Sequence, residues 1–416
     1  MSLERIFSER NVLDYSTACL ELGVKMPEVR DSFDFDTLVV PSRGAVPFFL
    51  GACYSLNKLK KFGGEHEEFY EGLGVQKILS SLLPESLKVS SNINASKTKV
   101  IIVPFTADLN IGKFDPKENN DEYVKKTRNY WANVTASFFK ENGERERDPY
   151  FRSFADFILK DLEKREDVAL EYKNFPKIRR FSMIDTVISG RASNDILQAF
   201  DGLAQKLGND NLMPYGFLIV DEDGGKLRPY YNQYLMRKRL QGQLDIRKIP
   251  RIFSEDEGAS LLGVASVVYP SVMRGSKMLR KGGEEFFVGA GSWHPGYKIS
   301  EKHSDSFGKF MRMIYNGVDY VFAREYEVDE SKAERIRERF LDSKAEFLDH
   351  RARNIKAFCL GESVGLDIFP IRTERYSPKG VYETKSHVVH TPFDELSEKK
   401  AIQRLREITG ASQVNN

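Results

Sequence analysis

The sequence predicts an α/β protein with a central, mainly parallel sheet flanked by helices. From about residue 10 to residue 235, short apolar runs rich in β-branched residues alternate with helical patterns, which is typical of βαβ units. The run VIIVPF at residues 100–105 is apolar throughout, as expected for a strand buried on both faces of a parallel sheet. Beyond residue 250 this alternation ends, and we expect a large α+β extension or hood there.

The elements of the first part follow from hydrophobic periodicity and from the turn residues between them. In chain order we expect a helix near Val12–Leu22, a strand over Asp36–Val40, a helix over Ala45–Leu59, a strand over Lys99–Pro104, helices over Glu122–Phe139 and Tyr150–Arg165, a strand over Arg180–Ile184, a helix over Ser193–Leu207 and a strand over Tyr215–Val220. The turn Asp223-Gly224-Gly225 is expected to join the last strand to a hairpin partner over Lys226–Tyr231.

The second part of the chain has a different pattern of expected strands and helices. We expect strands over Ser260–Val272 and Glu284–Gly291, a basic loop over Arg274–Lys281, and long helices over Ser306–Arg324 and Glu330–Cys359. The chain therefore divides into one expected domain over residues 1–240, with a long insertion at about 105–178, and a hood or partner domain over residues 241–416.

Composition excludes several classes of protein. The net charge of +2 does not favour general nucleic-acid binding, so a nucleic-acid partner is not expected. The three cysteines, Cys19, Cys53 and Cys359, lie far apart without a CxxC pair, which argues against disulfides or a zinc site and suits a reducing cytoplasm. The charged N-terminus does not resemble a signal peptide, and no window approaches 18 apolar residues. We therefore expect a cytoplasmic protein without a membrane span.

The segment after Phe181 has the pattern of an anion site. A buried strand ends near Asp185, and the small-residue turn Ser189-Gly190-Arg191-Ala192-Ser193 leads into an amphipathic helix. Small residues let backbone N–H groups approach an anion, and a helix N-terminus favours negative charge. Ser193 could cap the helix or donate to a phosphate oxygen, and Asp185 could hold a ribose hydroxyl or a metal ion. An ordinary strand–turn–helix unit with a good cap is the alternative.

These residues resemble the phosphoribosyl diphosphate (PRPP) binding motif of type I phosphoribosyltransferases over Ile184–Ser193. A second segment, Leu38–Pro47, resembles the pyrophosphate loop of that family, with Ser42, Arg43 and Gly44 in the turn. The two motifs occur in the family's order, and the long polar stretch between them stands where the family has its mobile loop. The resemblance covers roughly residues 10–235.

The resemblance implies roles for these residues. Asp185 and Thr186 would be the catalytic pair that holds the ribose, with Asp185 also on Mg²⁺. Ser42, Arg43 and Gly44 would bind pyrophosphate, and Ser189, Gly190, Arg191, Ala192 and Ser193 would bind the 5′-phosphate. Thr186 replaces the family's second acid, which removes a charge that acts mainly in the transition state. The implied function is binding of PRPP or a nucleotide with Mg²⁺, with phosphoribosyl transfer to a base as the enzyme hypothesis.

Alternatives stay open for several features. Lys113 and Lys117 could fold over a pyrophosphate or be solvated loop lysines. Tyr230, Tyr231 and Tyr234 could stack on a base or form an aromatic core cluster. At the level of function, the substitution at Thr186 and the size of the second half favour a non-catalytic PRPP or nucleotide sensor whose C-terminal half acts on a protein partner. The basic segment Arg274–Lys281 is the basis of a third hypothesis, a nucleic-acid-associated regulator.

Overall fold

A computed structural model describes most of the chain. The described residues are 3–41, 45–61, 72–73, 98–103, 120–161, 173–187, 190–222, 227–253, 276–281, 284–289, 301–326, 329–359, 374–377 and 380–383.

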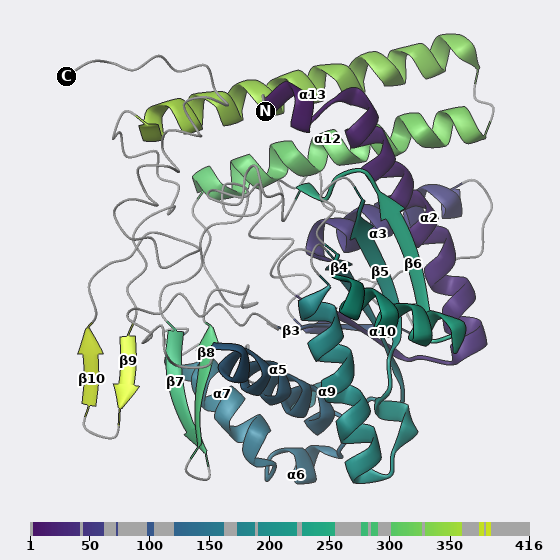
Figure 1. The fold of residues 1–416 in the computed structure, drawn as a ribbon. Coiled ribbons are helices and arrows are strands. Elements are labelled where there is room, and N and C mark those ends of the chain that lie inside the picture. Colours follow the sequence, from purple (N-terminus) through teal and green to yellow (C-terminus); the bar gives the residue numbers. More distant parts are fainter. Residues whose placement is uncertain are drawn as a thin grey trace.

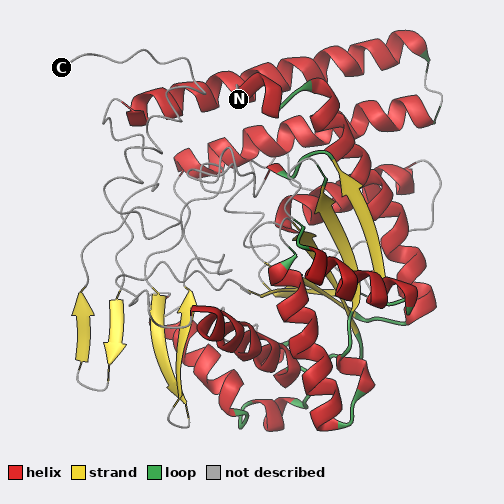
Figure 2. Ribbon diagram, viewed as in Figure 1, coloured by secondary structure: helices red, strands yellow, loops and turns green. Residues whose placement is uncertain are grey.

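A six-stranded sheet forms the centre of the molecule (Figure 1), and all of its neighbouring strands run parallel. Its strands, in spatial order, are β2 (Gly72–Leu73), β3 (Lys99–Val103), β1 (Thr37–Pro41), β4 (Phe181–Val187), β5 (Tyr215–Asp221) and β6 (Leu244–Ile249). Figure 2 shows helices on both sides of these strands. The expected α/β class, with a parallel sheet flanked by helices, is confirmed.

The helices and the smaller strands complete the fold. They are α1 (Leu3–Ile6), α2 (Glu9–Phe33), α3 (Ala45–Lys61), α5 (Asn120–Ser137), α6 (Asn142–Arg145), α7 (Pro149–Asp161), α9 (Arg191–Leu207), the 3-10 helix η2 (Asp210–Leu212), α10 (Pro229–Leu240), α12 (Glu301–Glu325) and α13 (Glu330–Cys359), with the antiparallel pairs β7 (Ser276–Lys281) and β8 (Glu284–Gly289), and β9 (Glu374–Ser377) and β10 (Gly380–Glu383). None of the helices among the described residues has a stretch that is apolar and long enough to cross a bilayer.

Each face of the sheet has its own hydrophobic core, because successive residues of a strand point to opposite faces. The first core cluster contains side chains of α2, α3, α12 and α13 together with Leu38, Ile184 and Phe217 of the strands. The second core cluster contains side chains of α5, α7, α9 and α10 together with Met183 and Leu218.

The first core cluster joins the N-terminal helix α2 to α12 and α13, which lie about 300 residues later in the chain. Helix α12 lies against α2 so closely that a Cβ atom on Gly317 would be 2.3 Å from the Ser16 hydroxyl. That hydroxyl donates hydrogen bonds to the carbonyl oxygens of Val12 (2.9 Å) and Ile314 (3.3 Å). Residues on both sides of residue 240 thus contribute to the first core cluster, and β6 belongs to the same sheet as β1 to β5.

A buried carboxylate also ties the C-terminal helices to α3. Asp319 of α12 is 7% exposed, and its Oδ1 accepts a hydrogen bond from the Tyr54 hydroxyl at 2.8 Å. The Lys58 ammonium lies 2.9 Å from the same oxygen, and Arg339 of α13 donates to Oδ2 at 3.2 Å. One carboxylate thus fixes three helices, and the pKa of Tyr54 is raised by burial and by this negative neighbour.

Two local predictions are wrong. Residues from Pro229 onward form α10 instead of a hairpin strand, and β6 then pairs parallel with β5. Proline fits the first turn of a helix because that turn leaves its N–H group unbonded. The basic segment at 274–281 is not only a loop, since Ser276–Lys281 is a strand that pairs with β8. The strand expected over Ser260–Val272 lies outside the described residues.

Candidate functional site

The order of the parallel strands reverses at β1. After β1 the chain forms β2 and β3 on one side of it and then returns to form β4 on the other side. In open α/β sheets, ligands bind in the crevice outside the carboxyl ends of the two strands at such a switch point. The motif residues of β1 and β4 lie at these two carboxyl ends.

The two strands separate where this crevice is expected. The β1–β4 ladder ends at the pair Val39–Met183, although β1 continues to Pro41 and β4 to Val187. On their outer sides both strands stay paired, β1 with β3 as far as Pro41 and β4 with β5 as far as Val187. The unpaired inner edges leave a gap in the hydrogen bonding of the sheet at its carboxyl end.

Strand alternation places Asp185 and Thr186 on opposite faces of β4. Met183 and Val187 belong to the second core cluster, so Asp185 lies on that face, whereas Ile184 belongs to the first core cluster and shares its face with Thr186. The side chains of Asp185 and Thr186 therefore point to opposite faces of the sheet.

Asp185 is buried and hydrogen-bonded at both oxygens. Its Oδ2 accepts from the Ser193 hydroxyl at 2.6 Å, and its Oδ1 accepts from the backbone N–H of Thr186 at 2.8 Å. Burial raises the pKa of Asp185 to about 6, although these two hydrogen bonds and the nearby Arg128 guanidinium favour the ionised form. The Ser193 hydroxyl, expected on a phosphate, is instead donated to this carboxylate.

Thr186 has a different environment. It is 4% exposed, and its hydroxyl finds no hydrogen-bond partner among the described residues. Ser182 lies four residues earlier on the same face of β4, and its hydroxyl also has no hydrogen-bond partner among the described residues. Of these two residues, only Thr186 lies in the part of β4 that is not paired with β1. Buried hydroxyls are normally satisfied, so this one is a candidate ligand donor.

The turn into α9 depends on Gly190. It is the N-cap of α9 and has a φ of 79°, a left-handed conformation that glycine adopts without strain. A Cβ atom there would lie 2.5 Å from Leu227 Cδ1 and 2.9 Å from Tyr231 Cβ. Arg191 and Ala192, the next two residues, are partly exposed at the first turn of the helix. The expected anion-binding turn is therefore a helix N-terminus that packs closely against the start of α10.

A buried ion pair beside Asp185 was not found from the sequence. Arg128 of α5 donates a hydrogen bond from Nη1 to Oδ2 of Asp195, and Arg191 Nε lies 3.8 Å from the same oxygen. Burial lowers the pKa of Arg128, and Asp195 opposes that shift. The sequence signal for Arg128 is weak, because an arginine inside an amphipathic helix usually belongs to its solvated face.

Other expected site residues are placed elsewhere. Ser42, Arg43, Gly44, Lys113, Lys117 and Ser189 lie outside the described residues. Tyr231 lines the turn at Gly190, and Tyr230 is 67% exposed. The Tyr234 hydroxyl donates to Asp201 at 2.7 Å, so Tyr234 is bonded to α9 beyond its first turn.

The described residues do not make up a metal site by themselves. In that part of the chain, no three or more His, Cys, Asp or Glu side chains cluster as ligands. Asp185 offers a single carboxylate that already accepts two hydrogen bonds. Mg²⁺ is commonly held by one or two carboxylates together with substrate phosphates.

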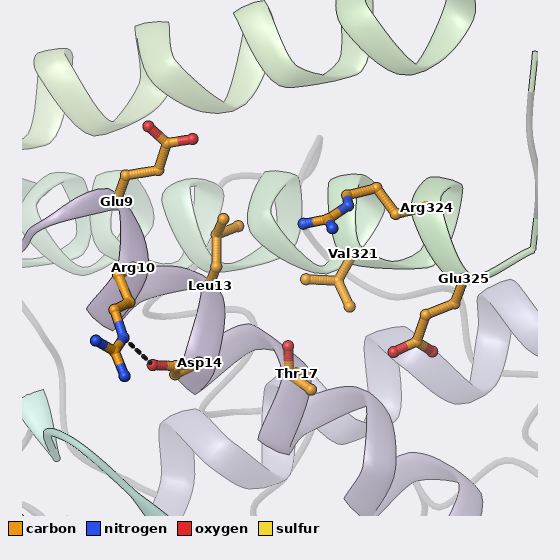
Figure 3. A pocket seen from close by; sticks show the side chains of 8 residues that line it. All are labelled: Glu9, Arg10, Leu13, Asp14, Thr17, Val321, Arg324 and Glu325. Carbon is orange, nitrogen blue, oxygen red and sulfur yellow. Dashed lines mark ion pairs between the residues drawn. The ribbon is translucent and has the colours of Figure 1, made fainter. Parts of the chain in front are cut away.

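A separate cavity lies between α2 and α12 (Figure 3). It measures about 690 Å³ and is lined by Glu9, Arg10, Leu13, Asp14, Thr17, Val321, Arg324 and Glu325. Acidic and basic side chains face it together, and Arg10 pairs with Asp14 at 3.7 Å within it. It includes no residue from the carboxyl ends of β1 and β4, so it is not part of the crevice.

We expect Asp185→Asn to change how stability depends on pH. The pKa of Asp185 is raised from 3.8 to about 6 in the folded protein, so between these values the folded state binds more protons than the unfolded state. Asp185 therefore contributes about 3 kcal/mol to the free energy of unfolding below about pH 4. This contribution is lost as the pH rises through 6. Urea unfolding from pH 4 to 7 should show wild type losing that amount relative to the variant. A constant difference between the two proteins would contradict this.

The crevice between β1 and β4, the buried Asp185 and the unsatisfied Thr186 hydroxyl define the candidate site. Comparisons of the chain with models of protein families, with curated proteins and with solved structures each find no match.

Proposed function

We propose that this protein binds a phosphorylated ribose, either PRPP or a nucleotide, in the crevice between β1 and β4. The observation that carries the proposal is the early end of the β1–β4 ladder at Val39–Met183. It frees the inner edges of both strands at the switch point, which is where open parallel sheets bind ligands. The resemblance of Leu38–Pro47 and Ile184–Ser193 to PRPP-binding motifs supports a ribose phosphate as the ligand class.

The ligand would use both sides of the β4–α9 turn. Its phosphate would lie at the first turn of α9, where Gly190 lets the backbone approach and the helix dipole favours an anion. A ribose hydroxyl would satisfy the Thr186 hydroxyl, which is buried in the separated part of β4. The PRPP diphosphate would bring Mg²⁺ and extend toward the end of β1.

Binding without phosphoribosyl transfer fits the geometry best. Transfer requires stabilisation of positive charge on the ribosyl ring, and in the resembled family two acids provide it. Here one of them is Thr186, which carries no charge, and the remaining acid, Asp185, is buried and hydrogen-bonded by Ser193. We therefore propose a sensor or regulatory protein, and pyrophosphate release in the presence of a base is the result that would favour the enzyme.

Calorimetric titration of PRPP, with and without Mg²⁺, and of nucleoside monophosphates tests the proposal. Thr186→Val should weaken binding about 3- to 10-fold, as expected for one lost neutral hydrogen bond. It should not destabilise the protein, because it removes a buried hydroxyl without a partner among the described residues. Ser182→Ala is the matched control, since it removes an equivalent hydroxyl from the paired part of β4 and should bind as wild type.

The proposal is overturned if folded wild type binds none of these ligands. Equal weakening by Thr186→Val and Ser182→Ala would place the ligand elsewhere, because only one of the two hydroxyls lies beyond the end of the β1–β4 ladder.

A further inference from the structure

Strand β6 forms one edge of the six-stranded sheet (Figure 1). It pairs with β5 on one side, and no strand of the described part of the chain pairs with its other side. The side chains of Arg247 and Lys248 are 47% and 57% exposed, so solvent reaches this edge. An open edge presents N–H and C=O groups that can pair with a further strand.

The directions of the backbone groups of β6 follow from its bonds to the neighbouring strand. The carbonyl oxygens of Gln243 and Ile249 each accept a hydrogen bond from the β5 side at 2.9 Å. Backbone groups alternate in direction along a strand, so every second residue of β6 points its N–H and C=O groups away from the sheet. These outward residues are Leu244, Ile246 and Lys248.

A second copy of the chain can pair with this edge only in certain registers. In an antiparallel ladder, residues whose backbone groups point to the partner strand pair with each other. Symmetric registers near the middle of β6 are therefore centred on Asp245, Ile246 or Arg247. A centre at Asp245 or at Arg247 would put identical charges directly opposite each other, which destabilises a strand pair.

The register centred on Ile246 is self-complementary in charge. It places Asp245 of each copy opposite Arg247 of the other copy, and the two-fold symmetry repeats this contact. Asp245 and Arg247 direct their backbone groups to β5, so they would form non-hydrogen-bonded pairs, in which facing side chains are closest.

Both side chains are available for this contact. Asp245 is half-buried and makes no hydrogen bond or ion pair with the described residues. Arg247 Nε lies 2.8 Å from the Glu21 carboxylate of α2, which holds the guanidinium on this face of the sheet. A guanidinium has five N–H donors, so Arg247 can serve a second carboxylate as well.

We propose that two copies of this chain associate through β6, in an antiparallel ladder centred on Ile246 that joins their two sheets into one. Asp245 and Arg247 set the register. Charges on an edge strand can also keep other strands away. Here they disfavour the neighbouring symmetric registers and favour this one. The inference does not depend on the ligand, since β6 contributes no residue to the crevice between β1 and β4.

Charge reversal tests the register. Asp245→Arg and Arg247→Asp each turn both attractive pairs of the dimer into repulsive ones, and we expect the dissociation constant to rise about 10- to 100-fold in either variant. Mixing the two variants restores opposite charges at both pairs, so the mixture should form a heterodimer with an affinity close to that of wild type. The double variant Asp245→Arg/Arg247→Asp should also dimerise, because it exchanges the two charges within each copy.

Asp349→Arg is the matched control. It reverses the acid of an exposed ion pair on α13, where Asp349 lies 2.7 Å from Arg353, and it should leave the association unchanged. Circular dichroism shows whether each variant is folded, and the double variant keeps the test decisive if one of the single variants is not.

Sedimentation equilibrium of the full chain over a wide range of protein concentration measures the association. Weakened single variants together with a restored mixture support the proposal. A wild type that stays monomeric overturns it, and the edge then takes a strand of another protein or no partner. A wild-type dimer that both single variants leave intact also overturns it, because the contact then lies elsewhere. Single variants that stay monomeric when mixed refute the register and with it the proposal.

Discussion

Phe310→Ala should lower the free energy of unfolding by about 3–5 kcal/mol, the range found when a buried aromatic side chain is truncated. Phe310 of α12 is 1% exposed, and its ring packs against Phe253 and Phe347 with centroid distances of 6.4 and 5.6 Å. Phe310→Leu, which leaves a much smaller cavity, should cost about 1 kcal/mol. Urea unfolding followed by circular dichroism measures both.

The same variant shows whether the two core clusters unfold together. Trp131 lies in the second core cluster, on the opposite face of the sheet from Phe310. In a Trp293→Phe background, Trp131 is the only tryptophan, so fluorescence reports on its face alone. If the clusters are one cooperative unit, the fluorescence and circular dichroism transitions shift together. A fluorescence transition that Phe310→Ala leaves in place would mean that two units unfold separately.

Gly190→Ala should cost about 2–4 kcal/mol, from left-handed strain at φ 79° together with overlap with Leu227 and Tyr231. Gly208→Ala is the matched control at the other end of α9. Gly208 has a φ of 60°, but no atom lies within 4 Å of the added Cβ, so only the backbone cost of about 1 kcal/mol applies. Chemical denaturation of the two variants and wild type gives the difference directly. Equal costs would mean that the turn adjusts to the added methyl group.

The regular elements were largely predictable because continuous apolar runs mark the fully buried strands, whereas a helical period of apolar residues marks the helices. The strand expected over Arg180–Ile184 is β4, which runs from Phe181 to Val187, and the helix expected from Ser193 begins at Arg191. The helix expected over Glu330–Cys359 has those bounds. The start of α10 was missed, since the Gly-Gly turn before it suggested a hairpin while Pro229 is equally suited to begin a helix.

The site was only partly predictable. A motif shows which residues lie near the end of a strand, so Asp185 and Thr186 were identified. It does not show their surroundings. The hydrogen bond from Ser193 to Asp185 arises where α9 packs on β4, and the Arg128–Asp195 pair arises where α5 packs on α9. Arg128 and Asp195 are 67 residues apart in the chain, a separation that no local pattern reveals.

The hydrogen bond from Ser16 to the carbonyl of Ile314 spans 298 residues. A ribosome makes the chain from its N-terminus, so α2 leaves the exit tunnel long before α12 is synthesised. Until then, the apolar side chains of α2 that pack against α12 in the folded protein remain exposed. Among the described residues, the buried members of the second core cluster lie between Val39 and Leu244, so they are all synthesised earlier. Until α12 and α13 are made, we therefore expect the first face of the sheet to be covered by α2 and α3 alone. Such a partly covered intermediate is prone to aggregation and is a natural substrate for chaperones.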